Sequence, residues 1–360
     1  MKLTQVDERA TSGADRDGCQ EPLIFAHGFS WRKARLLRRF LPEHRIEFVQ
    51  DWTSVPERAT VAVWGSATVP AREGRVLRVE DGFLRSVGLG ADLVSPVSWV
   101  IDTRGIHYDP SSESDLEALL QKTAFEADLI GRAAKLRAEI VAAGLTKYNV
   151  GAMEWQRPPR ATRVALVIGQ VEDDASVRLG ATGIRTNLDL LQTVRRQMPS
   201  AYVVYKPHPD VVAGLRRSGS DEQRANCYCD EVLLSASLSS VLAQVDEVHV
   251  MTSLTGFEAL LRHKPVYAYG LPFYAGWGLT RDAQPIPRRT RRLSVDELTA
   301  GVLILYPRYL SRTTGELVAP EQAVQELLAW RGKLPKDESA VERALRAPVR
   351  RLLRWNQARP

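Results

Sequence analysis

The sequence predicts an α/β protein made of two Rossmann-like domains whose parallel sheets face each other across a cleft. Short apolar runs rich in Val, Ile and Leu alternate with helical segments, which is typical of βαβ units. Several of these runs end in charged or hydroxyl residues, at the strand ends where open parallel sheets bind ligands. We therefore predict an N-terminal domain at 20–150, a linker at 151–161, a C-terminal domain at 162–335 and a basic tail at 336–360.

The composition fits a folded protein of this kind. A chain of 360 residues, 44% of them hydrophobic, is long enough for two domains that each bury a core. The three cysteines are too few for a disulfide framework, and Cys227 and Cys229 lack the two-residue spacer of a zinc or redox pair. No apolar run approaches the roughly 20 residues of a membrane span, and residues 1–18 lack the apolar centre of a signal peptide. We therefore expect a cytoplasmic protein.

The first half contains four apolar runs separated by helical or turn segments. The strands predicted from these runs are Leu23–Ala26, Ile46–Val49, Val61–Trp64 and Arg75–Val79. A helical stretch rich in Ala, Leu, Glu and Lys follows from Ser114 to about Ala143. Two prolines and the absence of apolar periodicity then mark residues 154–160 as a linker.

The second half starts again with a continuous apolar run, Val164–Ile168, which is typical of a strand buried on both faces. The elements predicted after it are helix Asn187–Gln197, strand Ala201–Tyr205, helix Ser237–Ala243, strand Glu247–Val250, helix Thr255–Arg262 and strand Val266–Tyr269. Strands separated by helices at this spacing are joined by right-handed crossovers and lie parallel.

The net charge of +6 is moderate, but arginines are concentrated in residues 32–39, 288–292 and 343–359. Such clusters favour anionic partners. Apolar residues alternate with arginines in the last cluster, which therefore either touches an anionic leaflet at the inner face of the plasma membrane or forms a solvated terminal helix. We expect no nucleic-acid binding, because neither zinc-finger spacing nor an aromatic RNA-binding signature accompanies the charge.

Two groups of carboxylates follow predicted strands. Glu80 and Asp81 are adjacent, and one acid can be kept neutral by the charge of its neighbour, which suits acid–base chemistry; a solvated acidic turn has the same composition. Asp173 and Asp174 follow the first strand of the second half. A carboxylate there suits a nucleophile at the anomeric carbon of a sugar, whereas the spaced oxygen ligands of a metal loop are missing.

Two further strand ends carry groups that favour a phosphate. Lys206 supplies a point charge and His208 a hydrogen-bond donor, and a proline on either side restricts the backbone of His208. Residues 252–258 pass from hydroxyl residues and a glycine into a helix, and Thr255 with Glu258 fits a capping box. Free N–H groups at such a helix start attract a phosphate without a metal, although an ordinary capped helix has the same sequence.

Three aromatic residues, Phe273, Tyr274 and Trp277, lie among glycines after the last predicted strand. This composition suits a loop that lines a cleft with aromatic faces for a sugar ring. It equally suits a loop that packs the junction between the domains, so the sequence leaves both interpretations open.

Together these motifs resemble those of the capsular polysaccharide β-Kdo transferases of the KpsC/LipB type, which share a sialyltransferase-like GT-B plan of two Rossmann-like domains. The stretch Phe-Tyr-Ala-Gly-Trp-Gly at 273–278 is the most specific of them. The other segments that carry the resemblance are residues 80–86, 169–176, 206–210, 253–260, 269–280 and 306–309. Well-known members of this family carry two such modules, whereas this chain carries one.

The resemblance implies a retaining glycosyltransferase that moves Kdo, an acidic eight-carbon sugar, from CMP-β-Kdo to a Kdo acceptor linked to a (lyso)phospholipid in capsule-linker synthesis. It implies that Asp81, beside Glu80, is the acid–base residue, and that an aspartate is the nucleophile, for which we prefer Asp174 to Asp173. CMP-Kdo is then the donor substrate, and no metal or other cofactor is required.

The resemblance also implies a set of contacts. His208 is assigned to catalysis as well as to donor binding. The residues assigned to donor binding are Gln170, Lys206, His208, Pro209, Ser253, Leu254, Thr255, Gly256 and Glu258. The residues assigned to sugar or acceptor contacts are Arg85, Tyr274 and Trp277. The partners implied are CMP-Kdo, the lipid-linked acceptor and, at the periphery, the inner membrane or capsule assembly proteins.

Other classes of function share these features. One is a different CMP- or UDP-sugar glycosyltransferase, or an epimerase or hydrolase acting on a sugar nucleotide; another is a non-catalytic polysaccharide-binding protein with a basic surface. Acceptor-dependent release of CMP separates them. An epimerase releases no nucleotide, a hydrolase needs no acceptor, and a binding protein does neither.

Overall fold

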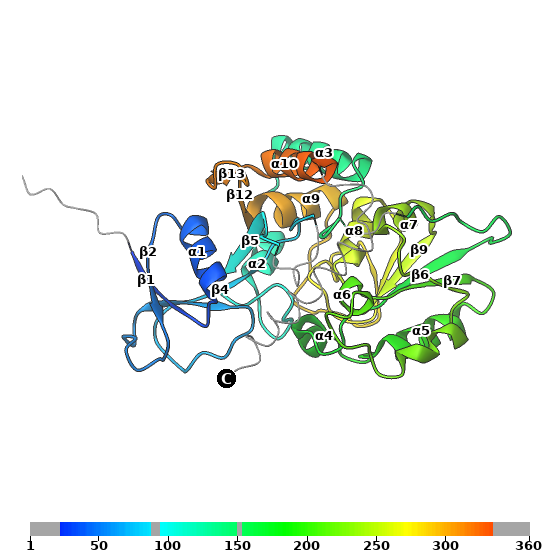
Figure 1. Cartoon of the computed structure of the whole chain (residues 1–360), viewed down its shortest axis with the longest axis horizontal. Coiled ribbons are helices and arrows are strands. Elements are labelled where there is room, and N and C mark those ends of the chain that lie inside the picture. The colour runs from blue at the N-terminus through cyan, green and yellow to red at the C-terminus, as the bar shows by residue number, and fades with distance from the viewer. Residues whose placement is uncertain (1–21, 88–93, 150–152, 334–360) are drawn as a thin grey trace, which may run out of the picture.

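The computed structural model describes residues 22–87, 94–149 and 153–333 and contains two β-sheets with helices packed around them. Figure 1 shows the two sheets side by side, the first mostly in blue and cyan with two orange strands from the end of the chain, and the second in green and yellow. Cys19 and the predicted basic tail at 336–360 lie outside the described residues. No helix within the described ranges is both long and apolar enough to cross a bilayer.

The first sheet has seven strands in the order β13-β12-β5-β4-β3-β1-β2. Its strands are β1 (Leu23–His27), β2 (Arg45–Val49), β3 (Thr60–Trp64), β4 (Val76–Asp81), β5 (Ser98–Asp102), β12 (Pro307–Leu310) and β13 (Leu317–Val318). The four predicted strands are confirmed as β1 to β4, and they pair with one another in parallel. Strands β5, β12 and β13 are added through antiparallel pairs. Because β4 runs on to Asp81, the adjacent carboxylates are the last two residues of a strand rather than part of a turn.

The chain returns to the first sheet near its end. Strand β12 pairs with β5, with Pro307 opposite Val100 and Tyr309 opposite Ser98, and β13 pairs with β12. These strands therefore belong to the first sheet, although the sequence prediction includes them in the range 162–335. Strand pairing between residues so far apart in the sequence leaves no local pattern from which it could be predicted. The domain boundaries themselves stay a prediction.

The second sheet has six strands in the order β11-β10-β9-β6-β7-β8, all parallel to their neighbours, as the sequence predicts. Its strands are β6 (Val164–Ile168), β7 (Tyr202–Lys206), β8 (Glu231–Val232), β9 (Glu247–Val250), β10 (Val266–Ala268) and β11 (Arg281–Asp282). All five residues of β6 are buried, because this strand is central and helices cover both faces. The carboxyl ends of β6, β7 and β9 consequently meet at one edge of the sheet.

The four predicted helices are present, one of them as two helices, and the described residues contain five further α-helices for which the sequence analysis gave no bounds. The predicted helix Ser114–Ala143 is two helices that are interrupted at residues 123–126. The α-helices are α1 (Trp31–Phe40), α2 (Asp115–Lys122), α3 (Ala127–Ala142), α4 (Ala175–Gly180), α5 (Asn187–Gln197), α6 (Pro209–Val212), α7 (Leu238–Gln244), α8 (Thr255–Leu261), α9 (Val295–Thr299) and α10 (Pro320–Lys333). A 3₁₀ helix at Glu222–Cys227 and a π-helical segment at Ala300–Leu305 complete the set.

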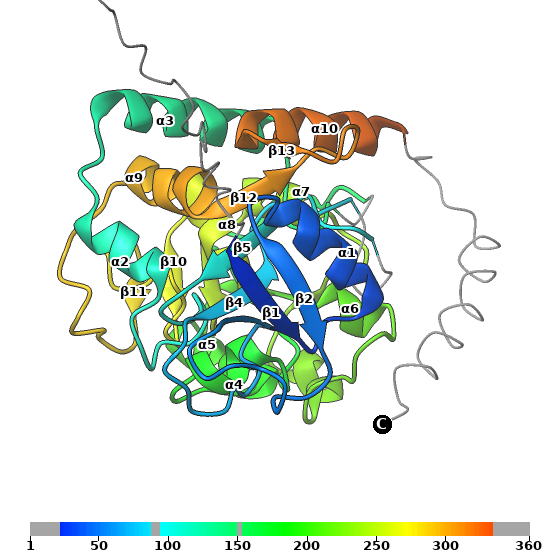
Figure 2. The same cartoon turned by 90° about the vertical axis from the view of Figure 1, so that its left-hand side faces the viewer.

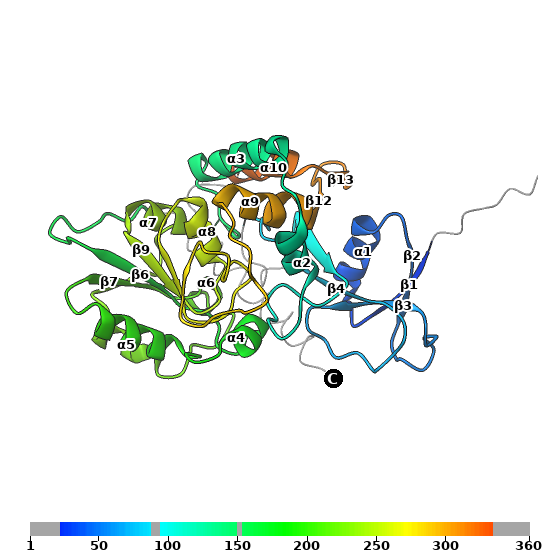
Figure 3. The same ribbon diagram turned by 180° about the vertical axis from the view of Figure 1, so that it is seen from behind.

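One continuous core joins the two sheets. Its buried members include Phe83 from the first half and Leu166 and Trp277 from the second. Helices α3 and α10 run along the same side of the molecule, as Figures 2 and 3 show, and an ion pair between Arg132 and Glu321 at 2.7 Å links them. A shared core fixes the orientation of the two sheets, and with it the space between their strand ends.

The second arginine cluster also has a structural role. Arg289 is buried and forms an ion pair with Glu117 of α2 at 2.8 Å, and Arg288 bonds the same carboxylate. Arg291 pairs with Glu297 at 3.1 Å. These three arginines connect segments of the fold, so they do not form the free anion-binding surface that their clustering predicts.

Candidate functional site

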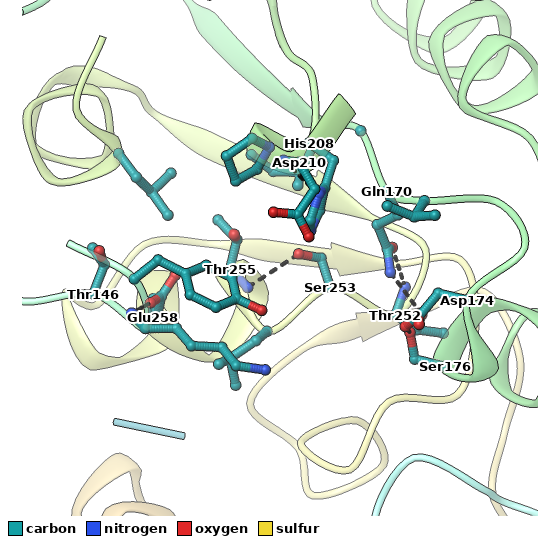
Figure 4. Close-up of a pocket in the computed structure, with 18 of the residues that line it drawn as sticks. Thr146, Gln170, Asp174, Ser176, His208, Asp210, Thr252, Ser253, Thr255 and Glu258 are labelled. Carbon is teal, nitrogen blue, oxygen red and sulfur yellow. Dashed lines mark hydrogen bonds between the residues drawn. The ribbon is translucent and has the colours of Figure 1, made fainter. Parts of the chain in front are cut away.

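A cavity of about 350 Å³ lies between the end of β4 in the first sheet and the ends of β6, β7 and β9 in the second. Figure 4 shows part of its lining, with His208 and Asp210 opposite Ser253 and Thr255. The predicted residues that line it are Glu80, Asp81, Gln170, Asp174, Lys206, His208, Pro209, Ser253, Leu254, Thr255 and Glu258. Residues from four strand ends, far apart in the sequence, thus share one space.

Glu80 and Asp81 are adjacent but have different environments. The carboxylate of Asp81 accepts hydrogen bonds from Arg85 Nε at 2.6 Å and from Trp99 Nε1 at 3.2 Å, so both of its oxygens are occupied. Glu80 accepts the backbone N–H of Asp81 at 2.9 Å and the Tyr108 hydroxyl at 3.4 Å, and it has no ion pair within 4.0 Å among the described residues. Burial and the neighbouring Asp81 charge raise the pKa of Glu80 to about 7. Glu80 therefore exchanges a proton near neutral pH, while Asp81 is held as part of an ion pair.

Asp174 and Asp173 face different surroundings. Asp174 precedes α4 and lines the cavity, and its Oδ2 accepts a hydrogen bond from Ser176 Oγ at 2.9 Å. Asp173 forms an ion pair with Arg216 at 2.8 Å, and the hydrogen bond from this guanidinium lowers the pKa of Asp173. Asp173 is absent from the cavity lining. Of the two carboxylates, Asp174 is the one that can meet a ligand there.

Lys206 and His208 bring two donors to the opposite wall. Lys206 is the last residue of β7; its Nζ donates to the carbonyl oxygen of Ala236 at 2.7 Å, and burial lowers its pKa to about 8. The backbone N–H of Asp210 donates to His208 Nδ1 at 3.2 Å, and burial lowers the pKa of His208. Because Nδ1 accepts, the neutral ring carries its proton on Nε2 and keeps that donor for a ligand.

The predicted capping box at α8 is wrong. Leu254, which precedes the helix, has helical backbone angles, and Thr255 is the first residue of the helix. Ser253 Oγ accepts the N–H of Thr255 at 3.2 Å, while the Glu258 carboxylate accepts the N–H of Lys147 at 2.7 Å. Glu258 therefore ties α8 to a segment of the first half instead of capping its own helix.

Gln170 connects two of the strand ends. Its Nε2 donates to Thr252 Oγ1 at 3.0 Å, and its Oε1 accepts the N–H of Thr252 at 2.9 Å (Figure 4). Asn187 Oδ1 accepts the backbone N–H of Gln170 at 2.8 Å. The side-chain amide of Gln170 is thus engaged at both ends and fixes the loops after β6 and β9. Its direct contact with a donor stays a prediction.

Four residues assigned to ligand contacts lie behind the cavity wall. They are Arg85, Gly256, Tyr274 and Trp277. Arg85 is 6% exposed and bonds Asp81; the Tyr274 hydroxyl donates to the Ser253 carbonyl at 2.5 Å; and Trp277 Nε1 donates to the Phe273 carbonyl at 2.8 Å. A Cβ at Gly256 would collide with the Tyr274 hydroxyl. Tyr274 and Trp277 therefore support the Ser253 loop from inside the fold, which corrects their expected sugar contacts, whereas Phe273 of the same loop lines the cavity.

Among the lining residues that the sequence analysis missed are His107, Tyr108 and Lys147, which come from the first half. Burial opposes the charge of Lys147, but the charges of Tyr148, Asp81 and Glu80 raise its pKa overall. Burial lowers the pKa of His107 to about 3, so this ring is neutral. All three belong to irregular segments after β5 or α3, where no periodic pattern indicates a functional residue. The one local signal is the position of Lys147, which lies between a threonine and a tyrosine shortly after α3.

Tyr108 lies between the two halves of the site. Burial raises its pKa, and the charges of Glu80 and Asp174 act in the same direction. His208 likewise responds to charges from both halves, among them Asp174 and Lys147. The carboxylates of the first half and the donors of the second are therefore close enough to act on one ligand.

That no metal is required stays a prediction. Within the described ranges, no three or more His, Cys, Asp or Glu side chains gather as they would to hold a metal ion.

The sequence matches a protein family described as "Capsule polysaccharide biosynthesis protein" over residues 56–150 and 130–309. It is 42% identical over 335 residues to the capsule polysaccharide modification protein LipA of Neisseria meningitidis serogroup A; the match covers 90% of this chain and 48% of LipA. The chain thus spans about half the length of that relative.

Two solved structures of KpsC from Thermosulfurimonas dismutans share the fold. The β-Kdo 2,7 transferase superposes with a TM-score of 0.73 at 38% identity, over 86% of this chain and 99% of the other. The β-Kdo 2,4 transferase gives a TM-score of 0.75 at 31% identity, over 86% and 98%.

Proposed function

Because the chain belongs to the capsule polysaccharide biosynthesis family of the KpsC/LipB type, we propose that it is a retaining glycosyltransferase that moves Kdo from CMP-β-Kdo to a lipid-linked Kdo acceptor. The proposal includes a GT-B arrangement, with the acceptor bound on the first-sheet side and the donor on the second-sheet side. The observation that carries it is the shared cavity, where carboxylates of β4 meet a lysine, an imidazole and a hydroxyl-rich helix start.

The second-sheet side suits the phosphate of CMP. His208 offers its Nε2–H, Lys206 offers an ammonium, and Ser253 and Thr255 offer hydroxyl groups. Charge-assisted hydrogen bonds of this kind stabilise a leaving phosphate. Since α8 has only seven residues, these side-chain donors contribute more than its macrodipole. The second negative group of the donor, the Kdo carboxylate, matches the ammonium of Lys147.

Asp174 is the proposed nucleophile. Its carboxylate attacks the anomeric carbon of Kdo, the bond from that carbon to the phosphate oxygen breaks, and CMP leaves with the bonding electrons. The acceptor hydroxyl then attacks the same carbon and displaces the Asp174 carboxylate. Two inversions give net retention. The hydrogen bond from Ser176 at 2.9 Å orients the aspartate for this role.

The proton of the acceptor hydroxyl passes to Glu80. A base with a pKa of about 7 accepts a proton efficiently at neutral pH. Asp81, to which the family resemblance assigns this role, has both oxygens bound by Arg85 and Trp99. Its proposed contribution is therefore indirect, because its charge keeps the pKa of Glu80 high.

No step of this mechanism requires a metal ion, because His208, Lys206 and the hydroxyl groups oppose the phosphate charge. We expect transfer to continue in excess EDTA; loss of transfer that Mg²⁺ restores would contradict this part of the proposal. Contact with the inner membrane or with capsule assembly proteins, expected for a lipid-linked acceptor, stays part of the proposal.

The test is acceptor-dependent release of CMP. The protein is incubated with a system that generates CMP-Kdo, with and without a synthetic Kdo-terminated lipid acceptor, and CMP is measured. We expect CMP to appear together with an acceptor heavier by one Kdo. CMP release at the same rate with and without the acceptor would indicate a hydrolase. Binding of the acceptor without any CMP release would indicate a binding protein.

A further inference from the structure

A second polar cluster lies beside Glu80 on the first-sheet side, outside the cavity lining. Helix α1 begins after Ser30, whose Oγ accepts the N–H of Lys33 at 3.5 Å. The Lys33 ammonium lies 3.2 Å from the centre of the Trp64 ring. Trp64 is the last residue of β3, which pairs with β4 in the sheet. The start of α1 and the ends of two neighbouring strands are thus brought together next to the proposed base.

Lys33 has no close ion partner among the residues with described positions. Its ammonium forms no ion pair within 4.0 Å and no hydrogen bond with them, and it lies against the Trp64 ring. Glu80 and Asp81 act on it electrostatically, but Arg85 already pairs with Asp81 at 2.6 Å. An ammonium removed partly from water without a partner is costly unless a ligand supplies the opposite charge.

A glycine allows Glu80 to lie close to the end of β3. Gly65 follows Trp64 and has a φ of 53°, in the left-handed region that favours glycine. A Cβ at this position would lie against Glu80 Oε2 and the Tyr108 hydroxyl. Gly65 therefore lets the Glu80 carboxylate and the Tyr108 hydroxyl pack against the backbone that follows Trp64, which places the proposed base beside the end of β3.

We propose that Lys33, held in place by Trp64, binds the carboxylate of an acidic sugar at the end of the acceptor. This assignment rests on the proposed transfer function and adds the residue that selects the acceptor. The attacking hydroxyl and the carboxylate belong to the same sugar, so the cation that binds the carboxylate must lie close to the base. Lys33 meets this condition because its ammonium lies over the Trp64 ring, and Gly65, the residue after Trp64, lies against the Glu80 carboxylate. A phosphate further along the lipid carrier would not lie so near the attacking hydroxyl.

Lys33→Met tests this subsite, because it keeps the apolar stem and removes the charge. The assay compares two phosphate-free acceptors: a Kdo glycoside and the same glycoside with its carboxyl group reduced to an alcohol. In the wild type we expect a lower KM for the acidic acceptor. In K33M the KM for this acceptor should rise about 10- to 100-fold, with little change for the reduced acceptor, because a charge-assisted contact is lost. Lys33→Arg should keep the preference.

Controls separate this role from a structural one. Arg35→Met removes an exposed charge two residues further along α1, on another side of the helix, and should behave as wild type. Thermal unfolding and CMP affinity should be unchanged in K33M. An equal loss on both acceptors, or an unchanged KM, would overturn the proposal. If the wild type transfers no Kdo, the transfer function fails, and calorimetric binding of the same two acceptors to wild type and K33M still tests the subsite.

Discussion

Replacing Glu80 by glutamine should stabilise the folded protein at alkaline pH and remove its transfer activity. Glu80 lies at the end of β4 beside Asp81, and burial together with that neighbour raises its pKa from 4.5 to about 7. Glutamine has nearly the same shape and can still accept the hydrogen bond from the Tyr108 hydroxyl. It cannot ionise, so it removes the cost of a buried charge and also the proposed base.

The magnitude follows from proton linkage. Below the unfolded pKa of 4.5 the carboxyl group is protonated in both states, so its charge costs nothing. As the pH rises, the unfolded chain ionises first while the folded protein retains the proton, and stability falls until the pH passes about 7. Each pK unit corresponds to about 1.4 kcal/mol, so the full difference is about 3 kcal/mol.

The assay is urea unfolding of wild type and E80Q at pH 5 and pH 8.5, followed by circular dichroism. The free energy of unfolding of E80Q should exceed that of wild type by about 3 kcal/mol at pH 8.5 and by little at pH 5. Asp81→Asn is the matched control: it leaves Arg85 buried without its partner and should destabilise the protein at both pH values. An E80Q effect that is equal at the two pH values would refute the raised pKa.

Three further predictions concern the second-sheet side. Asp174→Asn should lower transfer about a thousandfold or more and leave CMP affinity nearly unchanged, whereas Asp173→Asn should have a small effect; unchanged turnover in D174N would remove the nucleophile assignment. His208→Ala should weaken CMP binding about tenfold by calorimetry, because a hydrogen bond to phosphate is lost, and undiminished affinity would count against its placement. CMP affinity of the wild type should fall as the pH rises through about 8, where Lys206 loses its proton, whereas the affinity of Lys206→Met should not change over this range. A wild-type affinity that is equally independent of pH would exclude a contact between Lys206 and the phosphate.

The second sheet and its strand-end residues could be predicted from the sequence, because local patterns determine both. A continuous apolar run such as Val164–Ile168 has few alternatives to a central parallel strand, and the residues after such strands meet at one edge. Lys206, His208 and Asp174 reach the cavity for this reason.

The orientation of individual side chains could not be predicted in the same way. Tyr274 and Trp277 have the composition of a sugar-binding loop, yet both rings are buried, because what decides their direction is the packing of distant segments. Arg85 turns back to Asp81 instead of facing a ligand. Lys147 joins the site from an irregular segment, and β12 reaches the first sheet from the far end of the chain, so neither leaves a local signal.

The anomeric configuration of the product tests the central proposal most directly. Wild-type protein is incubated with CMP-β-Kdo and a Kdo-terminated acceptor, and the purified product is analysed by NMR and mass spectrometry. A β-linked Kdo added to the acceptor, formed together with one CMP, is the predicted result. An α-linked product would contradict the two-step reaction through Asp174, and free Kdo in place of a glycoside would contradict transfer itself.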